Sequence, residues 1–139
     1  MEGNNYMISE FIIEENEDEF IIGYGLLTLD KSTFKGKYKK VNNNNYEDEN
    51  YIVSAYVKNT SSEVMRDLSF DFKLYNKDGV VLGVAYSYIQ SIDPDETWKL
   101  KAVWYGEDSE EIADFKLLRV STPDLSYSKK QKKSFLKWL

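Results

Sequence analysis

A period-two pattern in the segment Leu68–Ile89 constrains the fold more than any other feature of this chain. Its first eight residues, Leu-Ser-Phe-Asp-Phe-Lys-Leu-Tyr, alternate between apolar and polar, and the next four, Asn-Lys-Asp-Gly, have turn composition. An apolar run follows the turn. This arrangement is typical of a β-hairpin with one buried face. We therefore predict an all-β fold with Phe72 and Leu74 in its core.

The same alternation occurs in two other segments. Apolar residues occupy every second position in 51–58 and again in 98–104. In the second segment Trp98 and Trp104 share their parity with Leu100 and Ala102. Residues of one parity along a strand point to one face of the sheet. Both tryptophans are therefore predicted to pack in the core. Tyr105 has the opposite parity to Trp104, and Tyr75 has the opposite parity to Leu74, so both tyrosines are predicted to face the surface.

Further strands are predicted in segments whose patterns are less regular. The segments are 6–13, 20–29, 31–41 and 112–120. The polar run 14–19, together with Gly23 and Gly25 in the second segment, suggests a hairpin with a bulge or a close backbone contact. The lysines of 31–41 suit an edge strand, because charged residues discourage pairing between sheet edges. The polar run 42–49 is expected to form a loop. About seven or eight short strands separated by turns are typical of a β-sandwich.

The composition excludes several classes of chemistry. The chain has 139 residues, which suits one domain, and it contains neither histidine nor cysteine. Disulfides, thiol nucleophiles, serine-histidine-aspartate triads and imidazole or thiolate metal sites are therefore excluded. The acidic stretches at 47–49, 93–96 and 107–111 lack the spacing of an EF-hand, so solvated loops are expected there. We expect no cofactor, no metal and no enzymatic activity.

Charge divides the chain into an acidic body and a basic tail. Residues 1–128 contain all 24 acidic residues and 13 basic residues, which gives a net charge of −11. Residues 129–139 contain five lysines, which gives +5. An acidic body repels nucleic-acid phosphates and anionic membranes. No nucleic-acid partner is therefore expected.

The tail at 129–139 is predicted to be a short, basic, amphipathic helical arm. Phe135, Trp138 and Leu139 would share one side of a helix. Such an arm suits an acidic protein groove or a membrane surface, and the alternative is that it packs on its own domain. The residues expected to contact a partner are Lys129, Lys130, Lys132, Lys133, Phe135, Lys137 and Trp138.

The N-terminal sequence bears on localisation. The chain has no apolar run of membrane-spanning length, and its first residues lack a basic start and an apolar segment. A cytoplasmic location is expected for the chain as given. The alternative is a bacterial cell-envelope or extracellular location, if a signal segment has been removed.

One motif carries a family resemblance. The sequence at 72–76 is Phe-Lys-Leu-Tyr-Asn, followed by Lys-Asp-Gly at 77–79, and it is flanked by Val-Lys-Asn-Thr-Ser at 57–61 and Ile-Asp-Pro-Asp-Glu-Thr-Trp at 92–98. Over residues 51–120 the chain resembles the FxLYD domain family. Asn76 stands where the family motif has Asp, and Asp95 stands where glycine is usual.

The resemblance implies an immunoglobulin-like β-sandwich, common in bacterial cell-envelope proteins and lipoproteins, without an assigned catalytic activity. Together with the chain length and the strand pattern, it predicts a single β-sandwich domain at 1–128 with an FxLYD-like core at 51–120, additional N-terminal strands and the C-terminal arm at 129–139. The motif residues are expected to be structural: Phe72, Leu74, Tyr75, Asn76, Gly79 and Trp98.

Three functional hypotheses follow. The first is a non-enzymatic protein-interaction module that presents loops, edge strands and the C-terminal arm to another protein, or that self-associates through edge strands or the arm. The second is a carbohydrate or cell-wall binding domain that uses exposed tyrosines, with Tyr75, Tyr86, Tyr88 and Tyr105 as candidates. The third is a small hydrolase that uses a pair of carboxylates.

Overall fold

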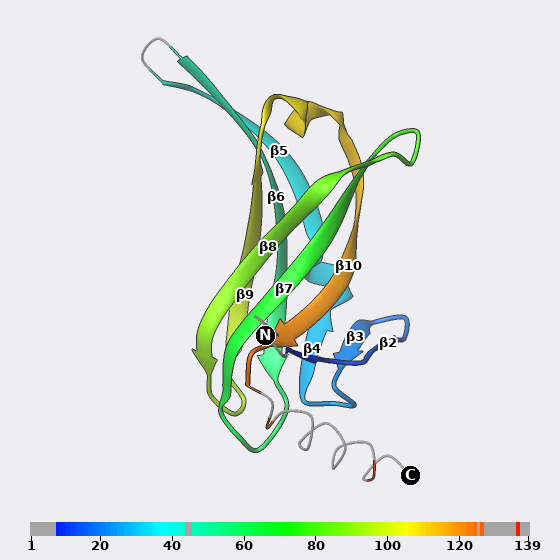
Figure 1. Cartoon of the computed structure of the whole chain (residues 1–139), viewed down its shortest axis with the longest axis vertical. Coiled ribbons are helices and arrows are strands. Elements are labelled where there is room, and N and C mark those ends of the chain that lie inside the picture. Colours follow the sequence, from blue (N-terminus) through cyan, green and yellow to red (C-terminus); the bar gives the residue numbers. More distant parts are fainter. Residues whose placement is uncertain (1–7, 44–45, 125, 127–135, 137–139) are drawn as a thin grey trace, which may run out of the picture.

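The computed structural model describes residues 8–43, 46–124, 126 and 136. This part of the chain forms ten β-strands and two short 3-10 helices (Figure 1). In chain order the elements are β1 (Ser9–Glu10), β2 (Ile13–Glu15), β3 (Glu19–Ile22), β4 (Leu27–Asp30), η1 (Lys31–Thr33), β5 (Lys35–Asn43), β6 (Tyr46–Asn59), β7 (Met65–Asn76), β8 (Val81–Ile92), β9 (Thr97–Tyr105), η2 (Glu107–Glu111) and β10 (Ile112–Thr122).

The strands form two antiparallel sheets, as the all-β prediction requires. Sheet A has four strands in the order β1-β10-β7-β8. Sheet B has six strands around β6, which pairs with β5 and β4 along one edge and with β9 along the other. β3 and β2 continue sheet B beyond β4. The two sheets pack against each other, with β8 and β9 on the same side of the molecule (Figure 1).

The core lies between the sheets and follows the period-two pattern. On β7 the side chains of Leu68, Phe70, Phe72 and Leu74 are fully buried. The ring of Phe70 meets that of Trp98 on β9, with centroids 5.7 Å apart and planes at 73°. Trp98 and Trp104 are half-buried and pack against this core. The predicted core positions on β7 and β9 are therefore confirmed.

The turn between β7 and β8 is built around Asn76. Its side-chain oxygen Oδ1 accepts hydrogen bonds from the backbone N–H groups of Asp78 and Val80, each at 2.9 Å. Gly79 has a φ of +78°, a left-handed conformation that glycine adopts without steric penalty. Asn76 thus supplies the acceptor that an aspartate would supply at this position. The predicted hairpin is confirmed.

Two glycines within strands lie beneath aromatic rings at opposite edges of the two-sheet stack. A Cβ atom on Gly83 of β8 would approach the indole of Trp104, 2.6 Å from Cζ3 and closer still to Cη2. A Cβ atom on Gly36 of β5 would lie 2.6 Å from Cε1 of Phe115 and collide with the hydroxyl of Tyr51. Both glycines therefore leave room for aromatic side chains from the facing sheet or the neighbouring strand.

The prediction of one strand from Phe20 to Leu29 is wrong. β3 ends at Ile22 and β4 begins at Leu27, and the two strands form a hairpin. Gly23, Tyr24 and Gly25 between them have φ angles of +63°, +57° and +99°. Successive left-handed residues reverse the chain and cannot continue a strand. The two glycines therefore mark a turn and not a bulge.

The prediction of a single strand over 6–13 is also wrong within the described residues. Ser9 and Glu10 pair with β10 in sheet A, whereas β2 pairs with β3 in sheet B. Between them Phe11 is buried, and its backbone N–H donates to the carbonyl oxygen of Val120 at 2.9 Å. The chain crosses from one sheet to the other at this residue.

A loop is predicted at 42–49, but its described residues, 42–43 and 46–49, belong to paired strands. β5 and β6 stay in register up to the pair Asn43 and Tyr46. Their paired ends project beyond the rest of both sheets (Figure 1). β5 lies at an edge of sheet B, as predicted for the lysine-rich segment 31–41, although the strand begins at Lys35 after η1.

At the end of β6 the fully buried side chain of Asn59 joins three segments. Its Nδ2 donates to the carbonyl oxygens of Glu63 and Ile92, both at 2.8 Å. Its Oδ1 accepts from the N–H and the hydroxyl of Ser61, at 3.0 and 2.7 Å. The backbone carbonyl oxygen of Asn59 also accepts from the N–H of Asp95 at 2.9 Å. Every polar atom of this side chain therefore has a partner, as its burial requires.

Candidate interaction surfaces

The residues predicted to bind a partner lie outside the described part of the chain. They are Lys129, Lys130, Lys132, Lys133, Phe135, Lys137 and Trp138. The predicted motif residues are described, and most of them shape the core or the β7–β8 turn. Tyr75 is half-buried, with the Nζ of Lys116 5.3 Å from its ring centroid. Candidate sites in the described residues must therefore be sought on the outer faces of the two sheets.

The outer face of sheet B carries a group of lysines that we call the lysine face. Successive side chains of a strand point to opposite faces of the sheet, so every second residue of each strand points outward, away from the core. On β5, β6 and β9 these positions include six exposed lysines: Lys35, Lys37, Lys39, Lys58, Lys99 and Lys101. The outward positions of β5 from 35 to 39, of β6 from 50 to 58 and of β9 include no aspartate or glutamate. This surface is basic although the chain as a whole has a net charge of −6.

Strand register sets the spacing of the lysine face. Lys35 and Lys101 both lie opposite Ser54 of β6, so they share one row two strands apart. Strand spacing places such positions about 10 Å apart, and alternate residues along one strand lie about 7 Å apart. Tyr56 and Tyr105 are exposed among the lysines. The result is a flat grid of positive charge with two aromatic side chains.

An acidic corner borders the lysine face at Lys58. Asp18, Glu19 and Asp30 line an open depression of about 370 Å³, together with Tyr56 and Lys58. The carboxylates of this corner come from the β2–β3 turn, the start of β3 and the end of β4. β4 runs along the same edge of β6 as β5, so Asp30 lies between Thr28, which pairs with Lys58, and Lys35, which pairs with Ser54. The charge of the outer surface of sheet B therefore changes sign along the sheet.

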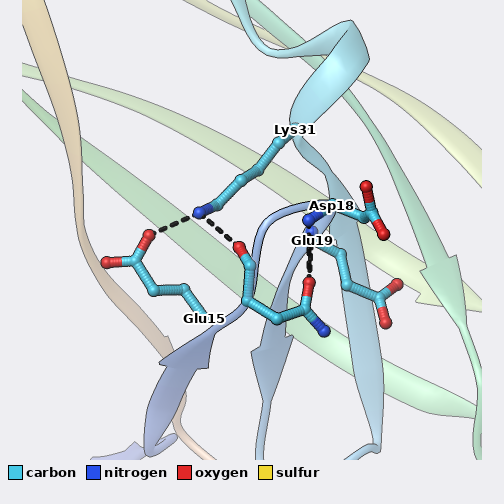
Figure 2. Close-up of polar contacts among 5 residues, drawn as sticks. Glu15, Asp18, Glu19 and Lys31 are labelled. Atoms are coloured by element: carbon cyan, nitrogen blue, oxygen red, sulfur yellow. Dashed lines mark hydrogen bonds and ion pairs between the residues drawn. The ribbon is translucent and has the colours of Figure 1, made fainter.

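The turn that carries two of these acids is fixed by its own polar contacts (Figure 2). The side-chain oxygen of Asn16 accepts from the backbone N–H groups of Asp18 and Glu19, each at 2.9 Å. Lys31 Nζ donates to Glu15 Oε2 and to the carbonyl oxygen of Asn16, each at 2.6 Å. Figure 2 shows the carboxylates of Asp18 and Glu19 pointing away from Lys31. Lys31 thus holds the turn in place without covering the acidic corner.

The outer face of sheet A carries exposed tyrosines. On β8 the side chains of Tyr86 and Tyr88 are 70% and 53% exposed. The hydroxyl of Tyr88 donates to Asp67 Oδ1 at 2.5 Å, and this hydrogen bond raises the pKa of Tyr88 above its ordinary value. Opposite Tyr86, Asp71 is paired with Arg119 through Nε and Oδ2 at 2.7 Å. Of the two tyrosines predicted at the surface, Tyr105 is 74% exposed and Tyr75 is half-buried.

Within the ranges 8–43 and 46–124, no three acidic side chains are grouped so that they could hold a metal ion. No helix in the described part of the chain is long and apolar enough to cross a bilayer.

The comparisons with protein-family models, curated proteins and solved structures find no match to this chain. The resemblance to the FxLYD family therefore rests on the motif residues alone.

Proposed function

We propose that this chain is a non-enzymatic protein-interaction module, built as an FxLYD-type immunoglobulin-like sandwich, whose lysine face binds an acidic segment of another protein. The observation that carries the proposal is the separation of charge on sheet B. Six exposed lysines lie at outward positions of β5, β6 and β9, where residues 35–39, 50–58 and 97–105 include no outward carboxylate, and the acidic corner with Asp30 begins at their border. Such a face attracts anionic partners and speeds their association at low ionic strength.

The shape of the lysine face favours an extended polypeptide as the partner. Lys35, Lys37 and Lys39 are spaced about 7 Å apart along β5. This spacing matches the distance between alternate side chains in an extended peptide. Tyr56 and Tyr105 offer apolar contact beside the charges. The acidic corner beside Lys58 repels carboxylates and phosphates alike, so the choice between an acidic peptide and nucleic acid is left to the binding comparison below.

Charge reversal on β5 tests this proposal. The variant Lys35→Glu/Lys37→Glu/Lys39→Glu is compared with the matched control Lys73→Glu/Lys77→Glu/Lys116→Glu, which changes the net charge equally on and near sheet A. The probe is a fluorescent glutamate-rich peptide, measured by anisotropy at low and high salt. Exposed ion pairs contribute about 0.2–1 kcal/mol each, so loss of three pairs should weaken binding by the β5 variant about three-fold to a hundred-fold. Equal binding by the two variants, or tighter binding of oligothymidine than of the peptide by the unaltered chain, contradicts the proposal.

The C-terminal arm is a second proposed contact. Its five lysines suit the same acidic partner or an anionic membrane surface. Deletion of residues 126–139 is expected to weaken capture of the glutamate-rich peptide. Unchanged capture, stability and oligomeric state would remove the arm from the functional account.

A second candidate function is binding of a carbohydrate or cell-wall polymer through Tyr86 and Tyr88. The observation in its favour is that these two exposed rings lie on the same face of β8, two residues apart. A glycan panel read by tyrosine fluorescence tests it. Responses that disappear in Tyr86→Ala/Tyr88→Ala would support this function, and no response to any glycan would count against it.

A further inference from the structure

β8 is the last strand of sheet A. It pairs with β7 in one continuous register from Gly83 to Ile92, and no other strand of the described residues pairs with it. The edge of β8 that faces away from β7 therefore presents backbone N–H and C=O groups that no described strand uses. Such an edge is a template for the addition of another strand.

β8 lacks the features that usually prevent pairing between sheet edges. From Val80 to Ile92 the sequence contains no charged residue and no proline. Its one irregularity, a register shift next to Leu82, lies at the turn end of the strand. By contrast, the edge strand β5 carries four lysines, and β9 carries Lys99 and Lys101. Charged side chains protect edge strands, so β8 is the unprotected member of the three.

The exposed apolar side chains of the molecule are concentrated on β8. Val81, Val84, Tyr86 and Tyr88 are all among the large hydrophobic residues that stay exposed. A tyrosine can bury about 150–250 Å², so at their exposed fractions Tyr86 and Tyr88 offer about 200–300 Å² per copy. Two copies therefore offer about 400–600 Å² of tyrosine surface, and Val84 and the paired backbone would supply the rest of the roughly 1,000 Å² that a specific interface requires.

The charges beside β8 are balanced, which suits an identical copy as the partner. Asp71 is paired with Arg119, and Asp67 accepts a hydrogen bond from Tyr88, while Lys73 lies opposite Val84. This edge therefore neither attracts a strongly charged partner nor repels an identical copy. Two identical strands related by a two-fold axis pair antiparallel and bury the same surface on both copies.

We propose that β8 pairs antiparallel with β8 of a second copy of this chain, joining the two A sheets into one continuous sheet. A pairing centred on Tyr86 places the two Tyr86 rings opposite each other and Val84 beside Tyr88. Aromatic and β-branched cross-strand pairs of this kind stabilise antiparallel sheets. The lysine face is on the other sheet, so the dimer leaves it open on both copies. The inference is thus independent of peptide binding at the lysine face, but it uses the same tyrosines, Tyr86 and Tyr88, as the carbohydrate alternative.

The test measures the oligomeric state and the backbone protection of the full chain. Sedimentation velocity over a range of protein concentrations is combined with amide hydrogen exchange of the β8 segment. Tyr86→Lys places a charge on the exposed edge, and Tyr105→Lys is its matched control, because Tyr105 is similarly exposed on sheet B. We expect a concentration-dependent dimer in which amide exchange within 84–90 slows. Tyr86→Lys should weaken this dimer at least about ten-fold, and Tyr105→Lys should leave it unchanged.

Several results would overturn the inference. A chain that stays monomeric at every concentration, with unchanged exchange in β8, would do so. So would a dimer that Tyr86→Lys leaves intact, or a monomeric chain that binds extended peptides at this edge. Because β8 is uncharged, the dimer should persist at high salt, whereas peptide binding at the lysine face should weaken. A failure of one proposal is therefore distinguishable from a failure of the other.

Discussion

Substitution of Gly83 by alanine should lower the free energy of unfolding by about 2 kcal/mol. The new methyl group would lie within 2.6 Å of the Trp104 indole, so the ring must move. The ring is tethered, because its Nε1 donates to Asp108 Oδ1 at 2.9 Å. Overpacking typically costs about 1–3 kcal/mol, and a weakened hydrogen bond to a carboxylate adds about 1 kcal/mol. The smaller backbone entropy of alanine offsets about 0.5–1 kcal/mol of this loss.

Urea unfolding followed by circular dichroism measures this loss. The variant Gly79→Ala is the control, since Gly79 has a positive φ but no atom within 4 Å of the added methyl group. It should lose about 1 kcal/mol through backbone conformation alone. A double-mutant cycle with Trp104→Leu then isolates the contact. In the Trp104→Leu background Gly83→Ala should be close to neutral, because the smaller side chain leaves room for the methyl group.

Two results would refute this reasoning. The first is a Gly83→Ala variant as stable as the unaltered chain. The second is a loss of stability that stays the same when Trp104 is replaced by leucine. Either result would mean that the indole does not occupy the space above Gly83.

Three further predictions concern the core, a turn and a tyrosine. Phe72→Ala removes a fully buried ring and should cost about 3–5 kcal/mol in urea unfolding, and a loss below about 1 kcal/mol would contradict the burial. Asp95 has a φ of +68°, so Asp95→Gly should be about 1 kcal/mol more stable than Asp95→Ala, whereas equal stabilities would show that this backbone is unstrained. The hydrogen bond to Asp67 raises the pKa of Tyr88 in the folded chain. This hydrogen bond therefore stabilises the fold at neutral pH, and the stabilisation is lost as the pH rises from the ordinary tyrosine pKa through the raised pKa of Tyr88. When the pH is raised from neutral to strongly alkaline, the free energy of unfolding should fall less for Tyr88→Phe than for the unaltered chain. Identical pH profiles of the two proteins would contradict this.

The parts of the fold that sequence predicts well are those governed by local pattern. The alternation on β7 fixes which side chains are buried, because a period of two admits only two faces and the apolar one must be covered. The turn at 76–79 is predictable for a similar reason, since the side chain of Asn76 and the backbone of Gly79 each satisfy a local requirement.

The errors arise where one local pattern is compatible with two structures. Gly23 and Gly25 fit a bulge as well as a hairpin, and only the left-handed conformation of the intervening Tyr24 distinguishes them. The asparagines at 42–45 have loop composition, yet the strands on either side remain paired up to Asn43. Here the pairing of β5 with β6 overrides the local propensity.

The lysine face could not be predicted without the order of the strands. Lys35 and Lys101 are far apart in sequence, and β6 alone brings them into one row. The sequence indicates that each strand has lysines on one parity, but it does not state which strands are neighbours. The position of β8 at the edge of sheet A could not be predicted either, because a hairpin pattern does not show whether a third strand pairs with the hairpin.

The burial of Asn59 has a practical consequence for producing this protein. Asn59-Thr60-Ser61 is an acceptor triplet for N-linked glycans, whose attachment atom is the asparagine Nδ2. In the folded chain that nitrogen is enclosed and donates to two carbonyl oxygens. Oligosaccharide added during synthesis in a eukaryotic secretory pathway would prevent the end of β6 from closing, so a host without this modification should give the native protein.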